Sequence, residues 1–131
     1  MIDRYLNHNQ NVKRLCREWK EHNGIIIAFD FDNTVFDYHN NGDTYDSIIN
    51  VLKICKDMGC TLILFTSCEE TKYNFMIEYL SSIGIHPDYI NEQPDCIPFK
   101  GKKIYYNILL DDRAGLESAY KVLLDTVNQM K

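Results

Sequence analysis

The sequence predicts an α/β fold with a doubly wound, Rossmann-like parallel sheet flanked by helices. Three segments, 25–29, 61–65 and the end of 104–110, are continuously apolar and rich in branched side chains. Buried parallel strands have this composition because both of their faces are covered. Segments with apolar residues at three- and four-residue spacing alternate with them, and this alternation indicates right-handed crossovers between parallel strands.

The expected elements follow in a simple order. A first helix is expected over 9–22, because apolar residues recur there at helical spacing and Asn23-Gly24 forms a stop signal. After the strand over 25–29, a helix is expected from about Thr44 to Gly59, and the strand over 61–65 follows. A helix over 73–83, a short edge strand near 89–90, the strand ending at 110 and a helix over 116–127 complete the chain.

The 131 residues are expected to form one domain, 1–131, with the helical segment 1–23 packed on it. Neither a repeat nor a linker interrupts the chain, and the three prolines fall in one stretch, 87–98, that reads as loop. The segments 34–44 and 66–103 leave no room for a folded lid, since an independent domain needs at least ~40 to 50 residues beyond the elements already assigned. We therefore expect a fold without a cap domain.

The composition excludes several classes of protein. Hydrophobic residues make up 45% and charged residues 25% of the chain, which is globular rather than disordered composition. The net charge of −5 provides no general positive field for nucleic acid or an anionic membrane. The five cysteines form no CxxC pair, and no secretory signal or membrane-spanning run is present, so we expect reduced thiols, a cytoplasmic location and no membrane partner.

Acidic residues follow two of the predicted strands. Asp30 and Asp32 come directly after the first strand, and Asp111 and Asp112 follow the last. Ligands of such sheets bind beyond the carboxyl ends of the strands. Carboxylates that converge there repel one another by on the order of 4 kcal/mol per pair at ~4 Å, and an all-oxygen set suits Mg²⁺. Alone, an Asp-x-Asp pair is more often a solvated turn, but the second acidic pair favours a metal site.

Hydroxyl and ammonium groups are predicted near the same edge. Thr66 and Ser67 end the second long strand, where a hydroxyl can contact a phosphate. Ser67 also forms a capping box with Glu70, so we assign capping to Ser67 and the phosphate contact to Thr66, with Ser67 kept as a substrate-binding candidate. A lysine would neutralise the phosphate, and three candidates, Lys100, Lys102 and Lys103, precede the last strand.

The ordered set Asp30-x-Asp32-x-Thr34, Thr66, a lysine and Asp111-Asp112 resembles the four motifs of the haloacid dehalogenase (HAD) superfamily of phosphohydrolases. The resemblance covers roughly 25–119. The segments 62–67, 90–94 and 103–114 are similar to short HAD proteins of bacteria and phages that have no cap, and this similarity favours Lys103 among the three lysines.

The resemblance implies a Mg²⁺-dependent phosphatase. Asp30 would be the nucleophile that forms an aspartyl-phosphate, Asp32 the general acid and base, and Thr66 and Lys103 would contact the phosphate. Mg²⁺ would be held by Asp30, the Asp32 backbone carbonyl and one or both of Asp111 and Asp112. Thr34 would brace the turn, and with Asn33 and Ser67 it would lie beside the substrate. The small phosphorylated substrate would be met by the loop 36–43, which includes Tyr38 and His39.

Two positions depart from the family pattern, and other functions remain open. Cys68 stands where a basic residue is frequent, and Asn33 stands where glycine is commonest. A phosphatase acting on the end of a nucleic acid or another polymer, a non-catalytic protein that binds phosphate or metal, and an oligomer are alternatives. A receiver domain of a signalling system uses similar groups, but its acidic pair comes first in the chain, and here it comes last.

Overall fold

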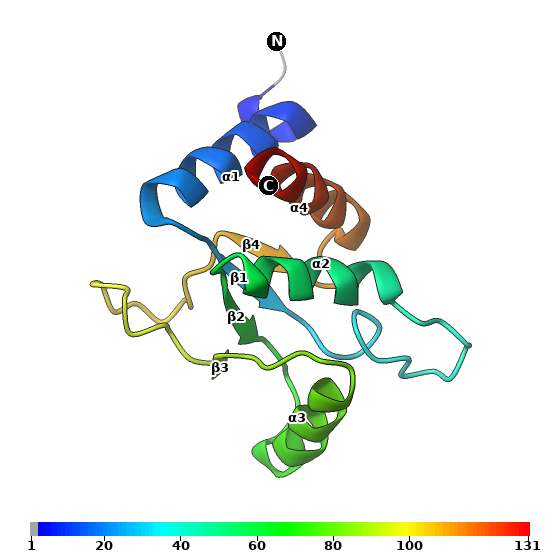
Figure 1. Ribbon diagram of the computed structural model, residues 1–131. Coiled ribbons are helices and arrows are strands. Elements are labelled where there is room, and N and C mark those ends of the chain that lie inside the picture. Colours follow the sequence, from blue (N-terminus) through cyan, green and yellow to red (C-terminus); the bar gives the residue numbers. More distant parts are fainter. Residues whose placement is uncertain (1–2) are drawn as a thin grey trace.

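The computed structural model describes residues 3–131, so the first two residues of the predicted domain lie outside the described residues. A four-stranded parallel sheet has the order β3-β2-β1-β4, and helices flank it (Figure 1). This arrangement confirms the predicted α/β class. The strands are β1 (Ile26–Phe29), β2 (Thr61–Leu64), β3 (Tyr89–Ile90) and β4 (Ile108–Leu110). The helices are α1 (His8–His22), α2 (Asp46–Asp57), α3 (Tyr73–Ser82) and α4 (Leu116–Met130), with short 3₁₀ turns η1 (Arg4–Leu6) and η2 (Glu70–Lys72).

Local interactions set both ends of α1, and the helix ends at the predicted stop signal. The Asn7 side chain accepts a hydrogen bond from the Gln10 backbone N–H at 3.0 Å and caps the start of the helix. Asn23 takes the left-handed conformation at its end, with φ 55°. Gly24 follows where the chain passes close to the turn before β2. A Cβ there would lie 2.7 Å from the Gly59 carbonyl oxygen, so only glycine fits.

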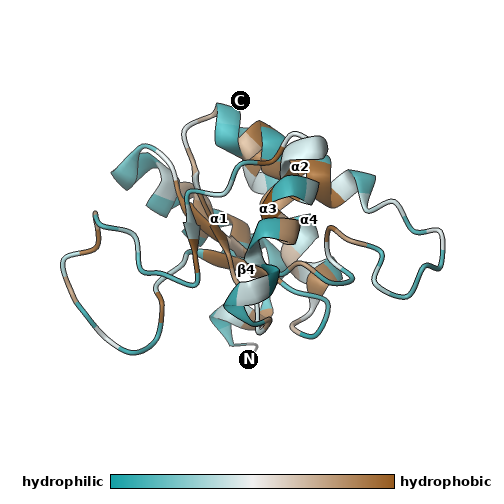
Figure 2. Cartoon of the chain, turned by 90° about the horizontal axis from the view of Figure 1, so that it is seen from below, coloured by the Kyte–Doolittle hydropathy of each residue, from teal (hydrophilic) through white to brown (hydrophobic). Residues whose placement is uncertain are grey.

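The two faces of the sheet are covered differently. One face packs into the main core, which receives buried side chains from all four helices, among them Leu15, Leu52, Leu80 and Leu123. Figure 2 shows these helices turning hydrophobic sides to the sheet. The other face, with Ile26, Ala28 and Ile63 at its centre, is covered by partly buried side chains of strand ends and the loop 91–107: Phe65, Tyr89, Ile97, Ile104, Tyr105, Tyr106 and Leu109. The described crossover from β3 to β4 is thus a loop rather than a helix.

The sequence predicts a strand at the apolar end of the segment 104–110, and β4 forms there, over Ile108–Leu110. The neighbouring strand determines where β4 begins. β1 begins at Ile26, so a residue before Asn107 has no strand beside it to pair with. Asn107 itself ends the ladder with two bonds. Its backbone N–H donates to the Ile26 carbonyl at 2.8 Å, and its side-chain oxygen accepts from the Ile26 N–H at 2.7 Å. The segment 104–106 instead folds over the second face of the sheet.

The topology fixes where a ligand site can form. From the central strand β1 the chain proceeds to β2 and β3 on one side, and it then returns to β4 on the other side. The boundary between β1 and β4 is therefore the topological switch point, where open α/β sheets bind ligands beyond their carboxyl ends. The segment 30–45, which joins β1 to α2, is a loop at that edge. Among the described helices, none is both long enough and apolar enough to cross a membrane.

Candidate functional site

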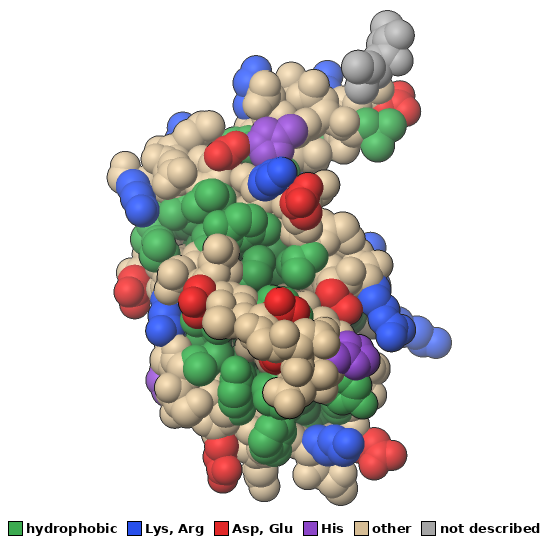
Figure 3. All heavy atoms as spheres, turned by 90° about the vertical axis from the view of Figure 1, so that its right-hand side faces the viewer, with side chains coloured by type: hydrophobic (Ala, Val, Ile, Leu, Met, Phe, Trp, Pro, Cys, Tyr) green, Lys and Arg blue, Asp and Glu red, His purple; other side chains and the backbone are tan. Residues whose placement is uncertain are grey.

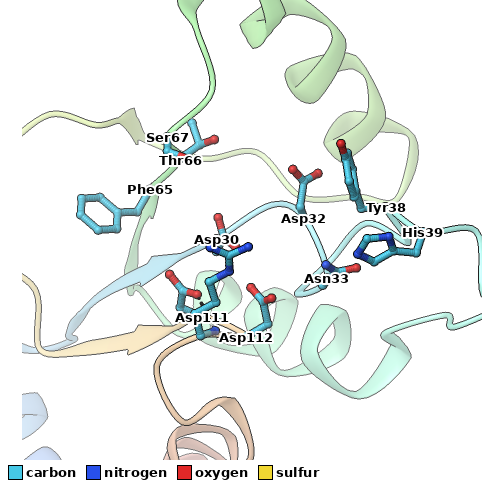
Figure 4. A pocket seen from close by; sticks show the side chains of 11 residues that line it. Asp30, Asp32, Asn33, Tyr38, His39, Phe65, Thr66, Ser67, Asp111 and Asp112 are labelled. Atoms are coloured by element: carbon cyan, nitrogen blue, oxygen red, sulfur yellow. Dashed lines mark hydrogen bonds between the residues drawn. The ribbon is translucent and has the colours of Figure 1, made fainter.

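A cavity of about 470 Å³ opens at the switch point (Figure 4). Acidic side chains lie in the middle of this face of the molecule, with histidine and basic side chains toward its edge (Figure 3). The cavity collects residues from the ends of β1, β2 and β4 and from the loop after β1. Its lining consists of Asp30, Asp32, Asn33, Tyr38, His39, Phe65, Thr66, Ser67, Asp111, Asp112 and Arg113. Seven of the nine site residues predicted from the sequence therefore line it. The two others do not: Thr34 is buried beside it, and Lys103 lies elsewhere.

Three carboxylates meet in the cavity. Asp30 follows β1, and Asp111 and Asp112 follow β4; one oxygen from each lies within 4.8 Å of the others. The Asp30 backbone N–H donates to the Leu110 carbonyl at 2.9 Å, which joins the two strand ends. The Arg113 N–H donates to the Asp111 carboxylate at 2.9 Å and orients it. The juxtaposition predicted from the sequence is present.

The pKa of Asp30 records the repulsion within this cluster. Burial is the largest cause, and together with a hydrogen bond that protonated Asp30 donates to the Asp112 carboxylate it raises the pKa of Asp30 from 3.8 to about 7. The negative charges of Asp111 and Asp112 act in the same direction, while the Phe31 backbone N–H stabilises the ionised form. Without a cation, the cluster holds a proton near neutral pH.

The three carboxylates could hold a metal ion, and the chemistry of their donor atoms suits Mg²⁺. All of the donors are carboxylate oxygens, which hard cations prefer, and their mutual distances allow one ion to contact all three. Besides burial, the negative charges of Asp111 and Asp112 raise the pKa of Asp30, so a cation bound among the three carboxylates would lower it. A divalent cation would replace the proton and remove the repulsion.

A tight turn after β1 positions Asp32. The Asn33, Val35 and Phe36 backbone N–H groups all bond within 31–36, the last two to the Phe31 carbonyl at 3.1 Å. Asn33 has φ 58°, the left-handed conformation that Asn tolerates, so its replacement of glycine costs little. Figure 4 shows Asp32 apart from the triad, beside Tyr38. Burial and the charge of Asp112 raise the pKa of Asp32, while Lys72 and His39 lower it.

Thr34 joins this turn to the end of β4. Its side chain is fully buried, and its hydroxyl oxygen accepts a hydrogen bond from the Asp112 backbone N–H at 3.2 Å. The contact links the loop after β1 to the second acidic segment. Thr34 thus braces the turn, as the sequence predicted, but a completely buried side chain is a positioning group rather than a substrate contact.

Thr66 and Ser67 lie in the cavity wall, but the predicted capping box is wrong. The first helical turn after β2 begins at Glu70, its cap is Glu69, and no side chain caps it. The Thr66 hydroxyl oxygen instead accepts the Cys68 backbone N–H at 3.1 Å and closes a local turn ahead of the helix. Ser67 is left facing the cavity, so both hydroxyls remain phosphate candidates.

Asn91 is a positioning residue that sequence reasoning missed. Its side-chain oxygen accepts the Thr66 N–H at 2.9 Å, and its amide donates to the Thr66 carbonyl at 2.7 Å and to the Tyr73 hydroxyl at 3.1 Å. Asn91 itself has φ 52°. The signal available was weak, since an Asn after a two-residue edge strand also suits an ordinary turn.

The basic side chains near the cavity are Arg113 and Lys72, and the predicted Lys103 is not among them. Lys103 is exposed and does not line the cavity, because the loop before β4 lies across the second face of the sheet. Spacing along an irregular loop does not determine the direction of a side chain, which is why the sequence misplaced it. Arg113 lines the cavity, and Lys72 lies near Asp32 at the start of α3.

Comparison with known proteins supports the fold. No protein-family model and no curated protein matches this chain. Among solved structures, the chain is similar to a conserved protein coded by a locus from Bacteroides thetaiotaomicron, with a TM-score of 0.65 and 23% identity over 83% of this chain and 93% of that one. At this identity the likeness establishes the shared architecture.

We expect replacement of Thr34 by Val to weaken Mg²⁺ binding and to lower the free energy of unfolding by about 1 to 3 kcal/mol, because the Asp112 N–H loses its acceptor. Thr126→Val is the matched control. Thr126 is equally buried, but its hydroxyl donates to Val122 within α4, far from the cluster. Calorimetric titration with Mg²⁺ and thermal unfolding measure both effects; equal Mg²⁺ affinity in the two variants contradicts the bracing role.

In chelator-treated protein, stability should depend on pH through Asp30. Its pKa in the folded state is raised to about 7, so the protonated form contributes stability that is present below about pH 4 and is lost as the pH rises through 7. Asp30→Asn should therefore unfold at a higher temperature than the parent at pH 8 and at the same temperature at pH 4. Solvent screens the half-buried group, and we expect a gain of about 1 to 2 kcal/mol. A pH-independent difference would contradict this cause.

Proposed function

We propose that the protein is a Mg²⁺-dependent phosphomonoesterase that works through an aspartyl-phosphate. The observation that carries the proposal is the division of four carboxylates into two groups. Asp30 lies with Asp111 and Asp112 in the triad, whereas Asp32 stands apart on the turn. A phosphate bound between them would meet a nucleophile on one side and a proton donor on the other.

The reaction balances with these residues. An Asp30 oxygen attacks phosphorus, the ester P–O bond breaks, and the departing oxygen takes a proton from Asp32. Asp32 then accepts a proton from water, whose oxygen attacks the phosphorus of the aspartyl-phosphate. Inorganic phosphate leaves, and Asp30 regains its free carboxylate. Burial shifts the pKa of Asp32 upward, the direction that favours its proton-donating form in the first step.

Mg²⁺, held by Asp30, Asp111 and Asp112 and by the Asp32 carbonyl, would neutralise charge on the phosphate and on the nucleophile. The other contacts come from the chain. Hydroxyls of Thr66 and Ser67 face the cavity, and the side chain of Arg113 lies in its wall. Charge-assisted hydrogen bonds from such groups hold phosphate oxygens in a fixed orientation.

The order of the elements favours this function over the signalling alternative. The candidate nucleophile follows the first, central strand, and the acidic pair follows the last strand. A receiver domain has the reverse order. A non-catalytic binding protein would need no separate proton donor, and the position of Asp32 therefore supports turnover.

Asp30→Asn should lower kcat on phosphate esters by about 10³-fold or more, because the amide is a poor nucleophile. With an activated aryl phosphate, whose leaving group departs without an acid, Asp32→Asn should instead accumulate the phosphoenzyme, because the second step lacks its base. Intact mass spectrometry after mixing with this substrate detects it. Asp125→Asn, a change on the exposed side of α4, is the control and should match the parent. Mg²⁺-dependent hydrolysis that survives Asp30→Asn would overturn the mechanism.

Arg113→Ala should raise KM for phosphate esters by roughly tenfold, as expected for the loss of one charge-assisted contact. Lys103→Ala should leave KM unchanged, because its exposed side chain lies away from the cavity. Steady-state kinetics on a panel of small phosphate esters and phosphorylated oligonucleotides compare the two variants. A loss confined to Lys103→Ala would restore the assignment made from the sequence.

A further inference from the structure

A second cavity adjoins the acidic one. Its volume is about 360 Å³, and it shares Asp32 and Tyr38 with the first cavity. The remaining walls come from the turn after β1 and from the segment that leads into α3. They are formed by Phe31, Phe36, Cys68, Thr71, Lys72, Phe75 and Met76.

The walls are aromatic, and part of that surface faces solvent. Phe31 and Phe36 stack with their ring centroids 5.0 Å apart, and Phe75 meets Phe36 edge to face at 5.7 Å. Phe31 is buried, whereas Phe75 is 55% exposed and Tyr38 is 60% exposed. Large exposed aromatic side chains beside a polar cavity are typical of ligand sites, because they leave apolar area uncovered until a ligand arrives.

The position of Asp32 between the two cavities indicates which part of a substrate would lie in the second one. In the proposed reaction it protonates the oxygen of the leaving group, so that oxygen must lie within hydrogen-bond distance of its carboxyl. The phosphate occupies the side of the triad, and the leaving group must extend to the other side of Asp32. The aromatic cavity is the space there, since Asp32 lines both cavities.

We propose that the aromatic cavity binds the nucleobase of a nucleoside monophosphate, the inference resting on the phosphatase function proposed above. A planar base stacks on aromatic faces whatever its identity. The Lys72 ammonium and the Thr71 hydroxyl line the same cavity and can donate to the carbonyl or ring-nitrogen acceptors of a base. A sugar phosphate without a base would leave the rings uncovered.

The decisive comparison uses two substrates that share the phosphate and the ribose. Hydrolysis of nucleoside 5′-monophosphates and of ribose 5-phosphate is measured with Mg²⁺ for the parent, Phe75→Ala and Lys72→Gln. Phe75→Ala should raise KM about tenfold for the nucleotides, the loss expected for one stacking contact, and should leave ribose 5-phosphate unchanged. Ile77→Ala is the control, because Ile77 is 42% exposed on the same helix but lines neither cavity.

Binding without turnover separates the two hypotheses. Calorimetric titration of Asp30→Asn with a nucleoside 5′-monophosphate should show affinity that the added Phe75→Ala change reduces. If the parent hydrolyses no ester but this binding and its loss are observed, the phosphatase proposal fails and the base site stands. If the parent hydrolyses esters but treats ribose 5-phosphate and nucleotides alike, or prefers a simple aryl phosphate, the nucleobase assignment is overturned.

Discussion

The architecture depends on the pairing of β1 with neighbours on both sides. This strand has four residues, all buried, and it holds β2 on one edge and β4 on the other. Because all three run in the same direction, their carboxyl ends meet at one edge. Ionisable groups from segments some 80 residues apart in the sequence then lie within one cavity. Strand pairing thus positions the acidic triad.

The same arrangement opposes the stability of the fold. Burial and the charges of Asp111 and Asp112 disfavour the ionised form of Asp30, and its pKa is therefore raised to about 7. Two hydrogen bonds hold the backbone of the cluster in place. The Asp112 N–H donates to the Thr34 hydroxyl, and the Asp30 N–H donates to the Leu110 carbonyl. Proteins commonly accept such local costs at functional sites, where the charge arrangement serves ligand binding rather than folding.

The sequence allowed prediction of the strands and the carboxylates because both depend on local patterns. A continuous apolar run must be covered on both faces, and the residue that follows it must lie at the sheet edge, so Asp30 and Asp111 could be placed with few assumptions. Lys103 and Ser67 could not be placed in this way. Lys103 lies within an irregular loop, so its direction does not follow from its spacing. The capping role of Ser67 was wrong because the Thr66 hydroxyl forms a local turn with Cys68 ahead of the helix. The cavity beside α3 was predicted only in part: the loop 36–43 was expected to meet the substrate and supplies Phe36 and Tyr38, but no local pattern places Phe75 of α3 beside them.

The loop crossover from β3 to β4 affects how this fold can vary. Helical crossovers must match the length of the sheet that they cover, because each residue of a helix adds a fixed rise. A loop has no such restriction, and the entropy of closing it grows only with the logarithm of its length, by about 0.6 kcal/mol for each doubling. The segment 91–107 packs against the sheet face that receives no helix side chain among the described residues. It is therefore the place where insertions can accumulate and new surface can be added while the acidic triad at the opposite strand ends keeps its geometry.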